Sequence, residues 1–207
     1  MINIGIVDFG FGNLKSIIQI IKKININLNI YLVNKNFNNF KKIDKLIIPG
    51  QGFNYKWIFN FFKNDFYQFI NLIINKTVLG ICVGKQVFFN KSDEFKSESL
   101  SLFNGNIKKF LNNNFKNKIP NIGWKKVFFT NNHLLLNNLN NSNSFYFSHS
   151  YYLIPFENNY TFGLTKNRIC FSSIYIRDNI FLLQFHPEKS FKQGFLIFNN
   201  FFNWKIQ

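Results

Sequence analysis

The chain has 207 residues, enough for one domain over 1–207 with a full hydrophobic core. Its formal net charge is +16, but the lysines are scattered and alanine is absent, which is typical of AT-rich codon usage and argues against nucleic acid as the partner. Two cysteines far apart in sequence and short apolar runs favour a cytoplasmic protein without disulfides or a membrane span.

The first half alternates strand and helix patterns. Apolar runs bounded by turn residues predict strands, and isoleucine or aromatic residues at helical spacing predict helices. The predicted strands are Ile2–Val7, Asn29–Val33, Lys45–Ile48 and Thr77–Ile81, and the predicted helices are Leu14–Ile24 and Trp57–Ile74. This rhythm indicates an α/β fold with an open, mostly parallel sheet flanked by helices.

The second half has a different pattern. Short β-type runs joined by Asn-rich turns predict antiparallel strands added to one edge of the sheet. These runs are Ile107–Leu111, Val127–Thr130, Ser144–Phe147, Tyr160–Leu164, Ile169–Ile176 and Ile180–Gln184. Arg177-Asp178-Asn179 predicts a hairpin turn between the last two, and a helix is expected over Phe191–Trp204.

Cys82 follows the strand Thr77–Ile81 in the pattern Gly-Ile-Cys-Val-Gly. Strand, G-x-C-x-G and helix together are the pattern of a nucleophile elbow, in which the glycines permit a sharp turn. The turn would lift the side chain out of the sheet at the carboxyl end of a strand, with the Val83 N–H directed to a developing oxyanion. The alternative is a small buried hydrophobic residue, the usual state of a cysteine.

The elbow alone does not activate a thiol. A free cysteine has a pKa near 8.5, and a helix N-terminus contributes only about 0.3–1 kcal/mol, less than one pKa unit. A catalytic cysteine here therefore requires a histidine partner. The chain has three histidines. His133 lies in an Asn-rich loop, where we expect it to be solvated, and His149, in F-S-H-S-Y-Y, is a candidate substrate-site residue.

His186 is the strongest candidate base. It follows an apolar strand, and Glu188 lies two residues further on, across a stiffening proline. At this spacing the carboxylate can fix the imidazole tautomer and stabilise the imidazolium. The alternative is a surface turn that precedes the last helix.

At this point the sequence resembles the class I glutamine amidotransferases of the Cys-His-Glu type. P-G-Q-G at 49–52, L-G-I-C-V-G-K-Q at 79–86 and Q-F-H-P-E-K-S at 184–190 are similar to the family's oxyanion turn, nucleophile elbow and His-Glu segment. Residues 6–16, 119–124 and 147–152 resemble the glutaminase subunits of imidazole glycerol phosphate synthases. The resemblance implies L-glutamine as substrate and a separate (β/α)₈ cyclase subunit, forming a heterodimer for histidine biosynthesis.

The resemblance also implies residue roles. Cys82 would be the nucleophile, His186 the general base and acid, and Glu188 the residue that orients it. The oxyanion would be held at Gln51, Gly52 and Val83. The glutamine pocket would comprise Gly50, Gly52, Gln86, Glu94, His149, Ser150 and Tyr151. Asn13 and Lys189 match positions near the interface with the cyclase.

Some residues depart from the family pattern. Lys85 stands where methionine is usual, and we expect it to extend to solvent rather than to lower the pKa of the thiol. Gln51 replaces a small aliphatic residue, and Lys15 replaces an arginine. Cys170 lies in a strand-like run, where we expect it to be part of the core.

Other functions remain open at this point. They are a glutaminase of another class I enzyme, an amidase or peptidase with the same fold, a non-catalytic scaffold, and a basic nucleic-acid-binding protein. No cluster of Cys, His and carboxylate residues has the spacing of a metal site, so we expect no metal and no cofactor.

Overall fold

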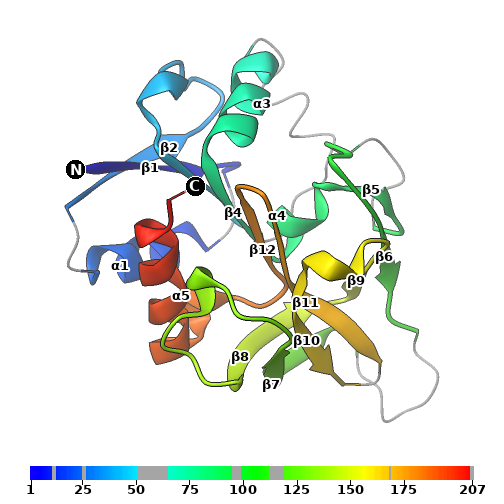
Figure 1. The fold of residues 1–207 in the computed structure, drawn as a ribbon. Coiled ribbons are helices and arrows are strands. Elements are labelled where there is room, and N and C mark those ends of the chain that lie inside the picture. The colour runs from blue at the N-terminus through cyan, green and yellow to red at the C-terminus, as the bar shows by residue number, and fades with distance from the viewer. Residues whose placement is uncertain are drawn as a thin grey trace.

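The computed structural model shows a central twisted sheet with helices packed against it (Figure 1). It describes residues 1–10, 13–24, 27–50, 65–94, 99–111, 119–167 and 169–205. The helices are α1 (Leu14–Lys22), α3 (Phe66–Asn75), α4 (Val83–Gln86) and α5 (Phe191–Asn203), with 3₁₀ turns η1 (Phe40–Lys42), η2 (Leu134–Leu136), η3 (Asn158–Tyr160) and η4 (Pro187–Lys189). Part of the helix expected over Trp57–Ile74, residues 57–64, lies outside the described residues.

Twelve strands are present in the described part of the chain. They are β1 (Ile2–Val7), β2 (Leu28–Val33), β3 (Lys45–Ile48), β4 (Thr77–Ile81), β5 (Phe89–Ser92), β6 (Phe103–Lys109), β7 (Asn121–Phe129), β8 (Ser142–His149), β9 (Tyr151–Pro155), β10 (Thr161–Lys166), β11 (Cys170–Arg177) and β12 (Ile180–Leu183). The main order is β2-β1-β3-β4-β12-β11-β10-β7-β8.

The sheet has a parallel and an antiparallel part. Neighbouring strands from β2 to β12 in the sheet order run parallel, and those from β12 to β8 run antiparallel. The short strands β5, β6 and β9 form a branch that joins the sheet through β9 and β11. The predicted α/β class, with antiparallel strands added by the second half, is therefore confirmed. The strands β5 and β9 were not predicted.

Apolar side chains cover both faces of the parallel strands. On one face, Ile17 and Ile21 of α1 and Phe198 of α5 pack over β1, β3 and β4. On the other face, α3 contributes Phe69 and Ile73 to a second core. Figure 1 shows α1 and α5 together on one side of these strands and α3 apart from them. This double coverage explains why the parallel strands are almost continuous apolar runs.

The topology brings three chain segments to one edge of the sheet. Ile48 of β3 is paired with Gly80 of β4, and Ile81 of β4 is paired with Leu183 of β12. These strands are parallel, so their carboxyl ends lie side by side, the position at which open α/β sheets place their sites. The residues that follow β3, β4 and β12 therefore meet there.

The expectation for Cys170 was wrong. Cys170 is exposed, because it is the first residue of β11 and pairs with Lys166 at the outer end of the strand pair. No helix in the described part of the chain has the length and apolar character required to cross a membrane.

Candidate active site

Cys82 occupies a strained turn between β4 and α4. Its backbone has φ 51° and ψ −106°, a conformation that a residue with a side chain adopts rarely. The Sγ atom lies 3.8 Å from the carbonyl oxygen of Ser148 and 3.9 Å from Nε2 of Gln184. Only 3% of the residue is exposed. The predicted sharp turn is present, and the thiol lies in a polar environment within the fold.

Close backbone contacts hold this turn. A Cβ on Gly50 would lie 1.9 Å from the carbonyl oxygen of Ile81 and 2.4 Å from the backbone nitrogen of Val83. A Cβ on Gly84 would lie 2.1 Å from the carbonyl oxygen of Ile48. The end of β3 is therefore packed directly on the elbow. Gln51 and Gly52, expected next to the oxyanion, lie outside the described residues.

His186 and Glu188 form a buried pair. Nδ1 of His186 and Oε1 of Glu188 are 2.8 Å apart, and their side chains are 1% and 2% exposed. The turn that carries them is held by Ser190, whose Oγ donates to the His186 carbonyl at 2.7 Å and accepts from the Tyr146 N–H at 3.0 Å. These contacts fix the imidazole, with Nε2 left for the thiol.

The pKa of His186 depends on its interaction with Cys82. Burial by itself lowers the pKa of His186, but the charge of Cys82 and hydrogen bonds with Cys82 and Glu188 outweigh burial and raise the pKa to about 10. An imidazolium between a thiolate and a carboxylate is favoured for the same reason. The predicted elbow and the His-Glu segment therefore come together, although about one hundred residues separate them in the chain.

The expectation that Lys85 extends to solvent was wrong. Lys85 is completely buried, and its Nζ donates to Oε1 of Gln184 at 2.6 Å and to the Ser172 carbonyl at 3.5 Å. Burial lowers the pKa of Lys85 to about 7, and the charge of Cys82 acts in the opposite direction. Polar groups on β11 and at the end of β12 provide the partners that keep the ammonium inside.

His149 has both ring nitrogens engaged. Nδ1 lies 2.7 Å from the Tyr151 carbonyl oxygen, and Nε2 lies 2.9 Å from Nδ2 of Asn121. Burial lowers the pKa of His149 to about 3, so the ring is neutral, donating from Nδ1 and accepting at Nε2. His149 thus holds the backbone of Ser150 and Tyr151, and its side chain has no free nitrogen for a substrate.

A group of polar residues follows the elbow. Gln86, on α4, forms a hydrogen bond with Glu94, and burial raises the pKa of this carboxyl more than the hydrogen bond lowers it. Burial and then the charge of Glu94 raise the pKa of the Tyr151 hydroxyl. Oε1 of Gln86 and Oε2 of Glu94 are buried and lack a partner among the described residues. They are free acceptors at the end of α4, the helix that follows the nucleophile, and are suited to an ammonium group.

A groove of 350 Å³ begins at Glu188 and runs between α1 and α5. It is lined by Ser16, Gln19, Ile20, Lys23, Glu188, Lys189, Phe191, Lys192 and Phe195. Asn13 occupies the N-cap position of α1 without a capping hydrogen bond to the backbone from its side chain, and its Oδ1 accepts from Oγ of Ser16 at 2.7 Å. Asn13 and Lys189, the two residues expected at an interface, therefore lie near the same groove.

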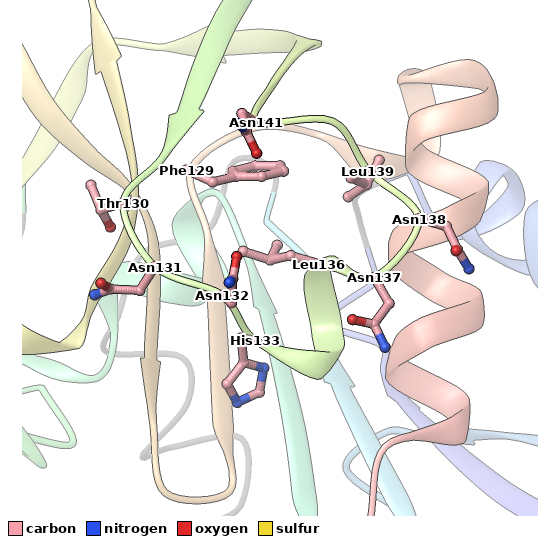
Figure 2. A pocket seen from close by; sticks show the side chains of 10 residues that line it. All are labelled: Phe129, Thr130, Asn131, Asn132, His133, Leu136, Asn137, Asn138, Leu139 and Asn141. Atoms are coloured by element: carbon pink, nitrogen blue, oxygen red, sulfur yellow. The ribbon is translucent and has the colours of Figure 1, made fainter.

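The third histidine belongs to a different hollow. Figure 2 shows this hollow, of 540 Å³, lined largely by asparagines of the segment between β7 and β8. Nδ1 of His133 accepts from the Leu135 N–H at 3.1 Å and so caps η2, and its ring contacts Phe162 and Trp204 edge-on. His133 is therefore half-buried and structural rather than simply solvated.

Sequence reasoning missed three supporting residues. Gln184 contacts Cys82, Ser190 holds the His186 turn, and Asn121 fixes the His149 ring. Gln184 alone had a visible signal, because it is a polar residue in the apolar run F-L-L-Q-F. No group of three or more metal-ligating side chains occurs in the described ranges.

The fold and site together define a cysteine hydrolase, with a thiol on a nucleophile elbow and a carboxylate-oriented histidine. A family model described as "Glutamine amidotransferase class-I" matches residues 5–204. A chain named "Imidazole glycerol phosphate synthase subunit HisH" from Prochlorococcus marinus is 37% identical, with 99% of this chain and 97% of that protein covered. A protein of the same name from Caldanaerobacter subterraneus is 36% identical, with 96% of each covered.

A solved structure agrees on the fold. A putative GMP synthase subunit from Thermoplasma acidophilum superposes with a TM-score of 0.69 at 20% identity, covering 98% of this chain and 93% of that one. The chain belongs to the class I glutamine amidotransferase family, in the branch of the HisH subunits of imidazole glycerol phosphate synthase.

Proposed function

We propose that this chain, as a single domain, hydrolyses L-glutamine to glutamate and supplies the ammonia to a (β/α)₈ cyclase subunit for imidazole glycerol phosphate synthesis. The observation that carries the proposal is the meeting of Cys82 with the buried pair of His186 and Glu188 at the carboxyl edge of the sheet. The full-length relatives named HisH supply the reaction and the pathway, histidine biosynthesis.

The proposed chemistry has two halves. The Cys82 thiolate attacks the side-chain amide carbon of glutamine, and His186 gives its proton to the departing ammonia. The resulting thioester is then attacked by water, from which His186 removes a proton, and glutamate leaves. Glu188 keeps the imidazole in one tautomer and balances its charge throughout.

The proposed substrate pocket uses the residues after the elbow. Glu94 and Gln86, with their unpaired oxygens, would receive the α-ammonium of glutamine, and the backbone of Ser150 and Tyr151 would line the pocket. The oxyanion would be stabilised by the Val83 N–H and by an N–H of the Gln51–Gly52 turn. Gly50, directly before that turn in the chain, packs on the backbone of Val83.

We propose that the cyclase docks over the groove beside Glu188, forming a heterodimer. The support is an aromatic patch at the groove, made of the exposed Trp124 and Phe191 and the half-buried Tyr146, with Lys189 above the Tyr146 ring at 5.7 Å. The rings of Trp124 and Phe191 stack at 5.3 Å, and the two residues are 43% and 79% exposed. Exposed aromatic residues of this kind are typical of interface cores.

Two unpaired thiols support a cytoplasmic location of the protein.

The experiment uses the complex with the cognate cyclase. Cys82→Ala is expected to abolish product formation from glutamine and to leave formation from ammonium salts intact. Cys170→Ala, a change at the exposed cysteine, is the matched control and should retain both activities. Retention of the glutamine-dependent reaction in Cys82→Ala, or loss of both reactions together, would refute the role given to Cys82.

A further inference from the structure

A lysine with no exposed surface lies beside the nucleophile. Lys85 comes from α4, three residues after Cys82, and its two hydrogen-bond acceptors are uncharged. Within the described residues no carboxylate pairs with it, although a buried ammonium ordinarily requires a counter-charge. Within the described part of the chain, the charge that raises the pKa of Lys85 against burial is that of Cys82.

The contact between Lys85 and Gln184 determines which way the glutamine amide faces. A lysine ammonium only donates hydrogen bonds, so the atom 2.6 Å from Nζ must be the Oε1 acceptor. The NH₂ group of Gln184 is then on the other side, with Nε2 3.9 Å from Sγ of Cys82. The backbone of Gln184 is held by its N–H donating to the Ser173 carbonyl at 2.9 Å.

Some neighbours of Sγ favour the neutral thiol of Cys82, and others favour the thiolate. The Ser148 carbonyl, 3.8 Å from Sγ, is an acceptor and favours the neutral S–H. The NH₂ group of Gln184 and the imidazolium of His186 are donors and favour the thiolate. The charge of Lys85 also favours the thiolate. Lys85, Gln184 and His186 therefore act against the Ser148 carbonyl, which favours the neutral thiol.

Two histidines also lie around this cluster. Burial, and to a smaller extent the charge of Lys85, lower the pKa of His149, which is neutral and bonded to a carbonyl and an asparagine. His186 has Glu188 behind it as its counter-ion. Among the described residues Lys85 therefore has no carboxylate counter-ion, and the charge of Cys82 is what opposes the lowering of its pKa by burial.

We propose that Lys85 is a positioning residue for the nucleophile: it holds the Gln184 amide as a donor to Cys82 Sγ and places a cation behind the thiolate. The inference rests on the proposed role of Cys82. It also explains why a lysine stands at a position where methionine is usual. The ammonium and the thiolate would stabilise each other as opposite charges.

The test is the pH dependence of Cys82 alkylation by iodoacetamide, which reacts with the thiolate. A Cys170→Ser background removes the exposed second thiol. Lys85→Met fills a similar volume without charge or donor, and its alkylation midpoint should move upward by about one pH unit, a tenfold lower rate on the acid limb. Lys45→Met is the matched control, since Lys45 is a buried lysine bonded to Thr77 and the Trp204 carbonyl, and its midpoint should not move.

A second variant separates charge from geometry. Lys85→Gln can still donate to Gln184 but has no charge, so a smaller upward shift is expected. It also decides the question if Lys85→Met fails to fold. The proposal would be overturned if the pH dependence of alkylation were the same in Lys85→Gln and in the parent protein. Equal shifts of the alkylation midpoint in Lys85→Met and Lys45→Met would also overturn it. The measurement requires no glutaminase activity, so its failure is distinguishable from failure of the proposed function.

Discussion

Oε1 of Glu188 lies 2.8 Å from Nδ1 of His186, and both side chains are almost completely buried. The second carboxylate oxygen has no partner among the described residues, so the whole charge of Glu188 is directed to the imidazole. This pair makes His186 a base with a fixed tautomer. It is also the part of the site whose removal should affect turnover without affecting binding.

Glu188→Gln is expected to lower kcat for glutamine by about 10²- to 10⁴-fold with little change in KM, because the amide cannot balance the imidazolium. Steady-state kinetics of the complex measure this. Glu157→Gln is the control, since Glu157 pairs with Arg177 at 2.8 Å in a partly exposed ion pair. A kcat for Glu188→Gln equal to that of the control would contradict the role of the carboxylate.

Glu94→Gln is expected to raise KM for glutamine by about 10- to 100-fold, since a hydrogen bond to a charged group contributes roughly 1.5–3 kcal/mol. The change in kcat should be smaller. Asp93→Asn is the neighbouring control, because Asp93 pairs with Lys108 at 3.5 Å on the surface. Equal KM values for the two variants would show that Glu94 does not contact the substrate.

Phe191→Asn is expected to weaken binding of the cyclase about tenfold, or roughly 1.4 kcal/mol. Phe191 has φ 45°, a conformation that asparagine tolerates better than phenylalanine, so the fold should be preserved. Titration calorimetry with the cyclase measures the affinity. As a control, Tyr67→Asn removes an exposed aromatic ring from α3, away from the groove, and this variant should bind the cyclase as tightly as the parent protein does. A parent-like affinity of Phe191→Asn for the cyclase would exclude the aromatic patch as the docking site.

Lys45→Met should destabilise the protein more at high pH than at low pH. Burial lowers the pKa of Lys45 to about 8, against 10.5 for an exposed lysine, although the charge of Asp44 acts in the opposite direction. The unfolded chain therefore binds more protons between these values, and Lys45 adds stability as pH rises through that window. Loss of its hydrogen bonds costs about 1–3 kcal/mol.

Urea unfolding of the parent and the Lys45→Met variant across this pH range measures the difference. The unfolding free energy of the parent should exceed that of Lys45→Met by an amount that increases from pH 8 to pH 10.5. A difference that is constant or decreases would contradict a lowered pKa. Activity in the complex should be unchanged, since Lys45 lies at the amino end of β3, opposite the site.

The parallel half of the fold was predictable because its signals are local. Ile2–Val7, Lys45–Ile48 and Thr77–Ile81 are apolar runs cut by turn residues, and all three strands have the predicted bounds. β9 was missed because its pairing with β6 and β11 is decided by tertiary contacts. A pattern within one segment does not contain that information.

The elbow and the His-Glu segment were predictable because glycine, cysteine and H-P-E carry geometric constraints in sequence. The burial of Lys85 was not, since it depends on acceptors from Ser172 and Gln184, which lie 87 and 99 residues further along the chain. The exposure of Cys170 likewise depends on where β11 begins. Both expectations applied average residue behaviour to positions governed by the tertiary fold.

The central claim is that glutamine is hydrolysed through a thioester on Cys82. The most direct measurement is mass spectrometry of the complex after rapid acid quenching during turnover of L-glutamine. A glutamyl adduct on the peptide that contains Cys82, accumulating in a variant that slows thioester hydrolysis, is the predicted result. Turnover without an adduct on that peptide, or an adduct on Cys170, would contradict the account.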